Sequence, residues 1–202
     1  MGNPPVPITR REALKRGAII GGTVLWAVPV VQTLGMGQAF AATPSDQCVA
    51  TWAKSVIFAD QGDPKDDSLT IPPERSDPEN ALLAPDSKFF SLGYGGELVV
   101  RLAIPYYSGK NGEAIVVETT GGSYPEETAV VSVSATGDPG SWIFVGTASN
   151  TATPSLEASL DSVLPAPPSS IQYVRLVDTT DRTLHNAQSD GFDVNAVGIS
   201  CP

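Results

Sequence analysis

The chain has 202 residues with 12 basic and 22 acidic side chains, which gives a formal net charge of −10. Residues 42–202 hold 8 of the basic and 21 of the acidic side chains. Nucleic acids and anionic membranes bind cationic surfaces, so this balance argues against both as partners. It is compatible with calcium binding and equally with an ordinary soluble extracellular surface.

The first 41 residues are typical of an export signal. The segment TRREALK over residues 9–15 resembles the twin-arginine motif, and no charged residue lies between Arg16 and Asp46. Glycines and a proline interrupt this stretch, whereas a permanent membrane span needs about 20 strongly apolar residues. Ala39-Phe40-Ala41 fits the small-x-small cleavage pattern. We therefore predict a bacterial signal peptide over residues 1–41, export through the twin-arginine translocase, and a secreted or envelope-associated domain over residues 42–202 without a membrane span. An uncleaved anchor is the alternative.

Short extended segments follow one another along the rest of the chain. Residues 60–88 are rich in Asp, Pro and Ser without periodicity, which predicts a long loop, either functional or loosely ordered. In residues 95–105, Leu98, Val100, Leu102 and Ile104 alternate as on one face of a strand. Residues 155–164 fit a short helix or a strand. Further strands are predicted at residues 113–119, 128–134, 141–148, 171–178 and 192–200, with a hairpin turn at 135–140.

This pattern predicts an all-β, antiparallel β-sandwich in a single domain. VSVSATGDPGSWIFVGTA (131–148) resembles the strand-turn-strand of galactose-binding-like, discoidin-type jelly rolls. Residues 79–102 and the pair 171–180 and 189–197 are similar to the opening and closing strands of bacterial cell-surface sandwich modules. The resemblance implies a jelly-roll fold. It transfers no function, because the family hosts many.

Cys48 and Cys201 stand at the two ends of the predicted domain. An even pair of cysteines in an exported protein predicts a disulfide bond. A two-cysteine metal site is the weaker alternative, because His185 is the single histidine and no Cys-x-x-Cys occurs.

The resemblance also implies a structural calcium ion, bound near one edge by loop oxygens and a C-terminal acidic residue. Calcium takes six to eight oxygen ligands. Alternatively, Asp190 and Gly191 form only a turn, and Asp193 and Asn195 form the solvent-facing side of the last strand. The candidate ligands in the matching segments are Asn80, Asp86, Glu118, Asp178, Asp190 and Asp193.

A glycan site is the second candidate, because sugars stack on exposed aromatic rings and bind a few polar groups. Trp142 is expected to pack inside. Arg175 lies mid-strand, where it either binds a ligand or Asp178, or balances carboxylates on the outer face. The tyrosines in or beside turns, which either bind a glycan or cover the rim, are Tyr94, Tyr106, Tyr107 and Tyr124.

Catalysis has little support in the sequence. His185 is expected in an exposed polar loop, no Gly-x-Ser-x-Gly elbow occurs, and no carboxylate pair is singled out by spacing. We therefore predict a secreted, non-catalytic module that binds a glycan or a surface protein. The alternatives are a structural protein with a calcium-stabilised sandwich and a glycan-active hydrolase.

Overall fold

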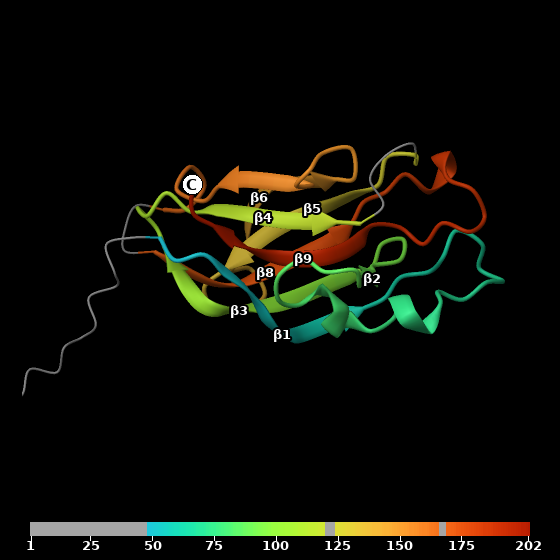
Figure 1. Ribbon diagram of the computed structural model, residues 1–202, viewed down its shortest axis with the longest axis horizontal. Coiled ribbons are helices and arrows are strands. Elements are labelled where there is room, and N and C mark those ends of the chain that lie inside the picture. The colour runs from blue at the N-terminus through green and yellow to red at the C-terminus, as the bar shows by residue number, and fades with distance from the viewer. Residues whose placement is uncertain (1–47, 120–123, 166–168) are drawn as a thin grey trace, which may run out of the picture. The chain divides into compact units, whose positions relative to one another are not determined.

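Nine β-strands and three short 3-10 helices make up the regular structure of the described residues. The computed structural model describes residues 48–119, 124–165 and 169–202, so the predicted signal lies outside these ranges (Figure 1). Within them, no helix has the length and apolar character needed to cross a membrane. The elements are β1 (Thr51–Asp60), η1 (Pro73–Arg75), η2 (Pro78–Ala81), β2 (Phe90–Ser91), β3 (Glu97–Tyr107), β4 (Glu113–Glu118), β5 (Thr128–Ser134), β6 (Ile143–Ser149), β7 (Leu156–Ser159), β8 (Ser170–Asp178), η3 (Arg182–Leu184) and β9 (Asp193–Ser200).

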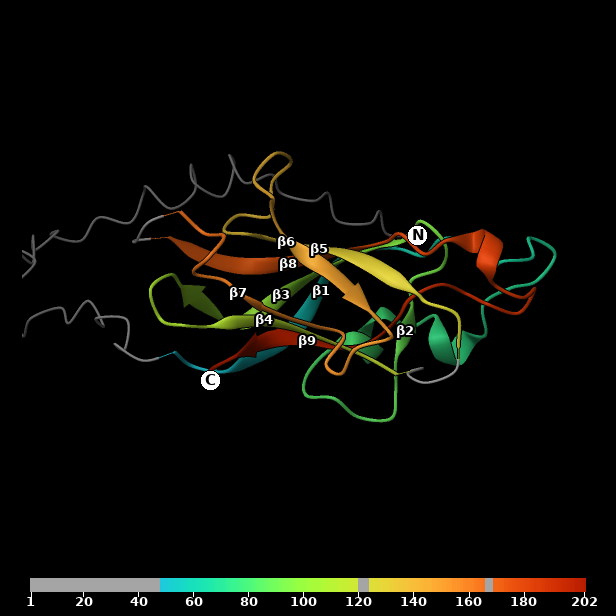
Figure 2. The ribbon, with the colours of Figure 1, turned by 90° about the horizontal axis from the view of Figure 1, so that it is seen from above.

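The strands form two antiparallel layers that share one strand. One layer has the order β6-β5-β8-β3-β1, and the other has the order β1-β9-β4-β7 with β2 beside β9. Figure 2 shows β5 and β8 in one layer and β4 and β9 in the other. Thr51 and Trp52 pair with β9, whereas Ala53 to Asp60 pair with β3, so β1 passes from one layer to the other. The predicted all-β antiparallel sandwich is confirmed.

The core lies between the two layers and follows the alternation of the strands. In β5, Ala129, Val131 and Val133 are buried, and in β8, Val174 and Leu176 face the same core. Successive side chains of a strand point to opposite faces of the sheet. The polar residues of these strands therefore lie on the outer faces. Burial of apolar area of this kind stabilises a domain by roughly 25 cal/mol per Å².

The alternation fails at two predicted positions. Ile104 is exposed, because the pairing of β3 with β8 shifts register between Arg101 and Tyr106. The pairing of β4 with β9 shifts register between Val117 and Glu118, and both faces of β9 are buried. Asn195 therefore does not face solvent, since its side-chain amide donates to two carbonyls of the 82–88 segment.

The predicted loop over residues 60–88 contains η1 and η2 and is joined to the sandwich by backbone hydrogen bonds. Gly62 N–H donates to Leu92 O at 2.8 Å, and Lys65 N–H donates to Ser189 O at 2.7 Å. The side chain of Arg182 donates to Pro64 O at 2.8 Å and to Lys65 O at 2.8 Å. The loop therefore covers one end of the sandwich in a defined conformation.

The disulfide between Cys48 and Cys201 closes the opposite end. Their Cα atoms are 5.7 Å apart across a sequence separation of 153 residues, which confirms the predicted pairing. We call this the disulfide end and the end with the 3-10 helices the loop end; they lie at opposite sides of Figure 1. At the disulfide end, Gly198 lies under Trp52, where a Cβ atom would come within 2.6 Å of the indole ring.

Removal of the disulfide should lower the free energy of unfolding. In the chain-entropy model a loop of this length contributes about 5 kcal/mol. We expect the Cys48→Ser, Cys201→Ser double variant to unfold at a clearly lower denaturant concentration than the oxidised protein. Denaturant titration checks this, with the reduced wild type as the matched control. Equal unfolding free energies for the oxidised protein and the double variant would contradict it.

Candidate functional site

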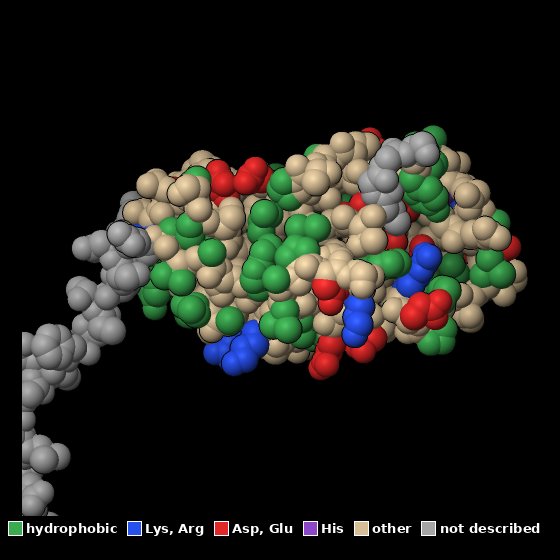
Figure 3. All heavy atoms as spheres, in the orientation of Figure 1, with side chains coloured by type: hydrophobic (Ala, Val, Ile, Leu, Met, Phe, Trp, Pro, Cys, Tyr) green, Lys and Arg blue, Asp and Glu red, His purple; other side chains and the backbone are tan. Residues whose placement is uncertain are grey.

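The loop end gathers ionisable side chains from several strand ends. β4 and β8 end here, β5 and β9 begin here, and β2 and the three 3-10 helices lie beside them. On the face that Figure 3 shows, acidic and basic side chains lie close together over this end. Strand ends converge at a sandwich edge, so residues far apart in sequence meet here.

Asp178, the last residue of β8, ties three segments of the loop end together. Its Oδ1 accepts from the backbone N–H groups of Gly95 (3.1 Å) and Thr180 (3.3 Å). Its Oδ2 accepts from Thr180 Oγ1 at 2.7 Å and from the Phe192 N–H at 2.9 Å. Burial raises the pKa of this carboxyl, whereas these hydrogen bonds lower it. Asp178 therefore has a structural role, and the alternative in which Arg175 pairs with it is not observed, since Arg175 pairs with Glu97.

Asp190 and Asp193 lie on either side of one hydroxyl group. Ser91 Oγ is 3.0 Å from Asp190 Oδ2 and also contacts Asp193 Oδ1. A hydroxyl carries one proton and can donate to only one of the two carboxyls. When Asp193 is protonated, its carboxyl can donate the second hydrogen bond to Ser91 Oγ. Arg75 pairs with Asp190 at 3.1 Å from the outer side.

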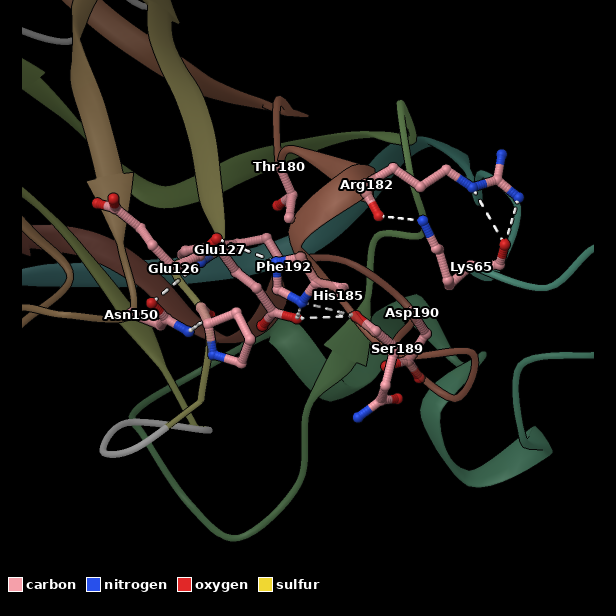
Figure 4. Close-up of polar contacts among 12 residues, drawn as sticks. Lys65, Glu126, Glu127, Asn150, Thr180, Arg182, His185, Ser189, Asp190 and Phe192 are labelled. Atoms are coloured by element: carbon pink, nitrogen blue, oxygen red, sulfur yellow. Dashed lines mark hydrogen bonds and ion pairs between the residues drawn. The ribbon is translucent and has the colours of Figure 1, made fainter.

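His185 is buried rather than exposed, so the prediction of an exposed loop histidine was wrong. Nε2 lies 3.1 Å from Glu126 O, and Nδ1 lies 3.2 Å from Ser189 Oγ and 3.7 Å from Glu127 Oε1 (Figure 4). The imidazole packs against Tyr94 and Tyr124, with ring centroids 6.0 and 5.6 Å away. The two aromatic rings and the polar contacts explain why the histidine lies inside.

Glu127 is the most strongly perturbed acid of the cluster. Burial is the largest cause that raises its pKa to about 9, and repulsion from Asp193 and Glu118 adds to it. Burial and the charge of Asp190 raise the pKa of Asp193 to about 7. Carboxyls that share a poorly solvated site resist ionising together. Near neutral pH the cluster therefore retains protons on Glu127 and, in part, on Asp193.

These side chains line a cavity of about 270 Å³. A second recess of about 280 Å³ adjoins it and shares Arg75, Gln188 and Asp190. Together the two have the dimensions of small-molecule sites, which span about 300 to 1,000 Å³. The first cavity is lined by Arg75, Tyr124, Glu127, Asn186, Gln188, Asp190 and Asp193.

The four predicted glycan-binding tyrosines divide between the two ends. Tyr124 lines the cavity, and Tyr94 lies behind it, where its hydroxyl donates to Ser189 Oγ at 2.7 Å. Tyr106 is buried, contrary to the expected exposure, because its hydroxyl donates to Asp161 and accepts from the Gly112 N–H. Tyr107 is exposed but pairs with Ser170 near the disulfide end. Tyr124 is thus the candidate that reaches the cavity.

Arg175 lies on the outer face of its strand. Its Nε and Nη2 donate to the two carboxylate oxygens of Glu97 at 2.7 and 2.8 Å. The guanidinium carbon lies 6.0 Å from the centre of the Trp142 ring. Trp142 is half-buried on this outer surface and does not belong to the inner core.

The six predicted calcium ligands do not form one group. The Asn80 amide donates to Glu74 O and Phe89 O, Asp86 Oδ1 accepts from the Lys88 N–H, and Asp178 is held as described above. Glu118, Asp190 and Asp193 are close enough to interact electrostatically. In residues 48–119, 124–165 and 169–202, no three ionisable side chains are arranged to hold one metal ion. Calcium binding stays a prediction.

Several cavity residues were missed by the sequence analysis. Arg75 lies in the aperiodic 60–88 segment, and Glu127 directly precedes a predicted strand. Asn186 and Gln188 lie in the polar loop around His185. In this loop only the histidine was considered, as a possible catalytic base. The turn residues Asn186 and Gln188 offered a signal, because polar loop residues next to a strand often bind ligands.

No family model matches the sequence, and no curated protein sequence matches it. Among solved structures, the chain is similar to the CBM32 of AlyQ in complex with 4,5-unsaturated mannuronic acid, at 16% identity and a TM-score of 0.46, over 76% of this chain and 98% of that chain. It is also similar to reduced XRCC1 bound to the DNA polymerase β catalytic domain, at 12% identity and a TM-score of 0.47, over 76% and 99%. The fold assignment rests on the strand order and pairing described above.

The raised pKa values of Glu127 and Asp193 predict that stability falls as pH rises. Between about pH 5 and about pH 9 the folded protein keeps protons that the unfolded chain has released, so unfolding becomes easier with increasing pH. We expect Glu127→Gln to flatten this decline. Thermal melting across this range at constant ionic strength checks it. The matched control is Glu126→Gln at the exposed neighbouring position, which should keep the wild-type slope; the same slope in both variants would refute the assignment.

Proposed function

We propose that the protein is a secreted, non-catalytic glycan-binding module and that the loop-end cavity takes a sugar residue. The observation that carries this proposal is the lining of the cavity: one aromatic ring, Tyr124, beside a fixed set of amide, guanidinium and carboxyl groups. Sugars present an apolar C–H face and a ring of hydroxyl groups, and such a lining is complementary to both.

Two carboxyls of the cavity are held in place before a ligand binds. Asp190 is fixed by Arg75 and Ser91, and Glu127 contacts Ser189 at 3.3 Å. Groups that are already oriented lose little conformational entropy on binding. Carboxyls that are oriented in this way favour a ligand with hydroxyls in fixed positions.

The charge of the cavity narrows the ligand class. Asp190, Asp193 and Glu127 are balanced by Arg75 alone among the lining residues. Near neutral pH Glu127 is protonated, but Asp193 is partly ionised and Arg75 is already paired with Asp190, so the lining leaves no unpaired positive charge for an anionic sugar. We therefore propose a neutral or amino sugar as the ligand of the loop end.

A binding role fits the geometry better than hydrolysis by a serine nucleophile. Ser189 and His185 are in contact, but Ser189 is fully buried and its oxygen accepts from Tyr94. The Nε2 atom of His185 faces a backbone carbonyl and not a second serine or substrate position. This serine–histidine pair holds the loop after β8 against Glu126 and Glu127, which directly precede β5.

The location of the protein is part of the proposal. A disulfide between Cys48 and Cys201 is typical of proteins in an oxidising compartment outside the cytoplasm. This supports secretion to the envelope or beyond, through the twin-arginine translocase that the N-terminal sequence indicates. A surface protein is the second partner class, to be separated from glycans by the same binding measurements.

Tyr124→Ala and Gln188→Ala should each weaken glycan binding about tenfold or more, because each removes a wall of the cavity. A glycan array of neutral, amino and anionic sugars identifies the ligand, and titration calorimetry gives the affinities. Tyr107→Ala removes a tyrosine that is 40% exposed near the other end and should bind as the wild type does.

Two outcomes would decide against this proposal. Silence across the array for the wild type would favour the protein-partner or structural role. Release of reducing sugar from a bound glycan, lost in Glu127→Gln, would establish the glycan-active hydrolase instead, with two carboxyls of different pKa as acid and base.

A calcium-stabilised structural sandwich is the second candidate. The observation that favours it is the repulsion that Asp190 and Glu118 exert on Asp193, which a cation held by one or two of these carboxylates, with backbone oxygens completing its shell, would relieve. Millimolar calcium is expected to raise the melting temperature of the wild type relative to chelator, and not that of Asp193→Asn. Asp138→Asn, in the β5–β6 turn, is the control. Equal melting temperatures with calcium and chelator would remove the metal from the proposal.

A further inference from the structure

A second groove crosses the outer face of the five-stranded layer. Strand pairing sets Phe58 opposite Val99, Val99 opposite Arg175, and Arg175 opposite Ser132. These residues form one row across four strands. Neighbouring strands are about 4.8 Å apart, so the row spans roughly 14 Å.

The groove has apolar walls at its two ends. On one side, the β5–β6 turn contributes Pro139, and Trp142 follows directly before β6. On the other side, Ile57 and Phe58 of β1 are 53% and 49% exposed. The groove between them has a volume of about 450 Å³. Large apolar side chains that remain exposed around a hollow are typical of a binding surface.

The floor of the groove is polar and carries no net charge. Arg175 and Glu97 form a two-pronged ion pair that also lines the groove. The pair uses two of the five N–H donors of the guanidinium, and each carboxylate oxygen keeps further acceptor capacity. The pair holds both groups in one orientation, so donors and acceptors face the groove in a fixed array.

We propose that this groove is a second glycan site, which binds a short stretch of an uncharged polysaccharide. The C–H faces of the sugar rings stack on Trp142 and Phe58, and the hydroxyls between them bond to Arg175 and Glu97. A charged ligand would have to break or unbalance the ion pair. An uncharged chain of hydroxyl-bearing rings leaves it intact, which is why the occupant is a neutral glycan.

This site is separate from the loop-end cavity. The two share no lining residue, and the groove is lined by residues of β1, β3 and β8 and of the β5–β6 connection. Two sites on one module bind a polysaccharide more tightly than either alone, because the second contact is intramolecular. The inference does not depend on the loop-end cavity holding a sugar.

Affinity electrophoresis of the purified protein tests the groove. The gels contain hydroxyethyl cellulose, galactomannan or dextran as neutral polysaccharides, and alginate as the anionic comparison. We expect retardation in at least one neutral gel and none in alginate. Phe58→Ala and Trp142→Ala should reduce the retardation at least tenfold in apparent affinity. Tyr107→Ala is the matched control, because this aromatic residue is 40% exposed, pairs with Ser170 near the disulfide end and does not line the groove.

The variants separate the two sites. Loss in Phe58→Ala with retention in Tyr124→Ala supports the sheet groove, even if the loop-end cavity binds no sugar. Loss in Tyr124→Ala with full retention in Phe58→Ala and Trp142→Ala overturns the groove and leaves the loop-end site standing. A wild type that no neutral polysaccharide retards overturns it as well. Phe58 is exposed, so its variant remains informative even where Trp142→Ala impairs folding, which thermal melting of each variant shows.

Discussion

The burial of one carboxylate, that of Asp178, organises the whole loop end. Its two oxygens accept four hydrogen bonds, from Gly95, Phe192 and twice from Thr180. The end of β8, the turn before β3 and the start of β9 are thereby held at one point. An unpaired buried charge would be costly, so these segments can move apart only together. The close approach requires Gly191, whose φ is +79° and whose Cβ position would lie 2.9 Å from Gly93.

The other acids of this end are placed by the same framework but are less well compensated. Asp190 has Arg75, whereas Glu127 and Asp193 lie among neighbours that raise their pKa. Buried carboxyls with raised pKa values lower the stability of the loop end, and an end with only a structural role would not require them. Carboxyls whose pKa is strongly shifted by burial and by neighbouring charges are often found at ligand-binding or catalytic sites. The carboxyls with raised pKa values are thus the same side chains that line the proposed binding cavity.

The strands of the sandwich were largely predictable, and the cavity was not. The alternation of apolar and polar residues predicted β5 and β8, because the inner side chains of these strands face a regular core. It missed β1, in which Ile57 and Phe58 lie exposed on the outer face and the pairing with β3 shifts register twice. His185 was misplaced because its burial depends on Tyr94 and Tyr124, which local sequence does not bring near. Composition marks residue types, but long-range packing decides which of them share a cavity.

The disulfide has a mechanical consequence. Cys48 and Cys201 are joined at the end of the sandwich remote from the carboxylate cavity. Tension applied to the chain on either side of this bond passes through the two sulfur atoms. This tension does not act on the pairing of β1 with β9, in which only Thr51 and Trp52 take part. Without the disulfide, the hydrogen bonds of this short pairing would break one after another. A domain pulled from its ends in this way keeps both proposed ligand surfaces intact until the disulfide is reduced.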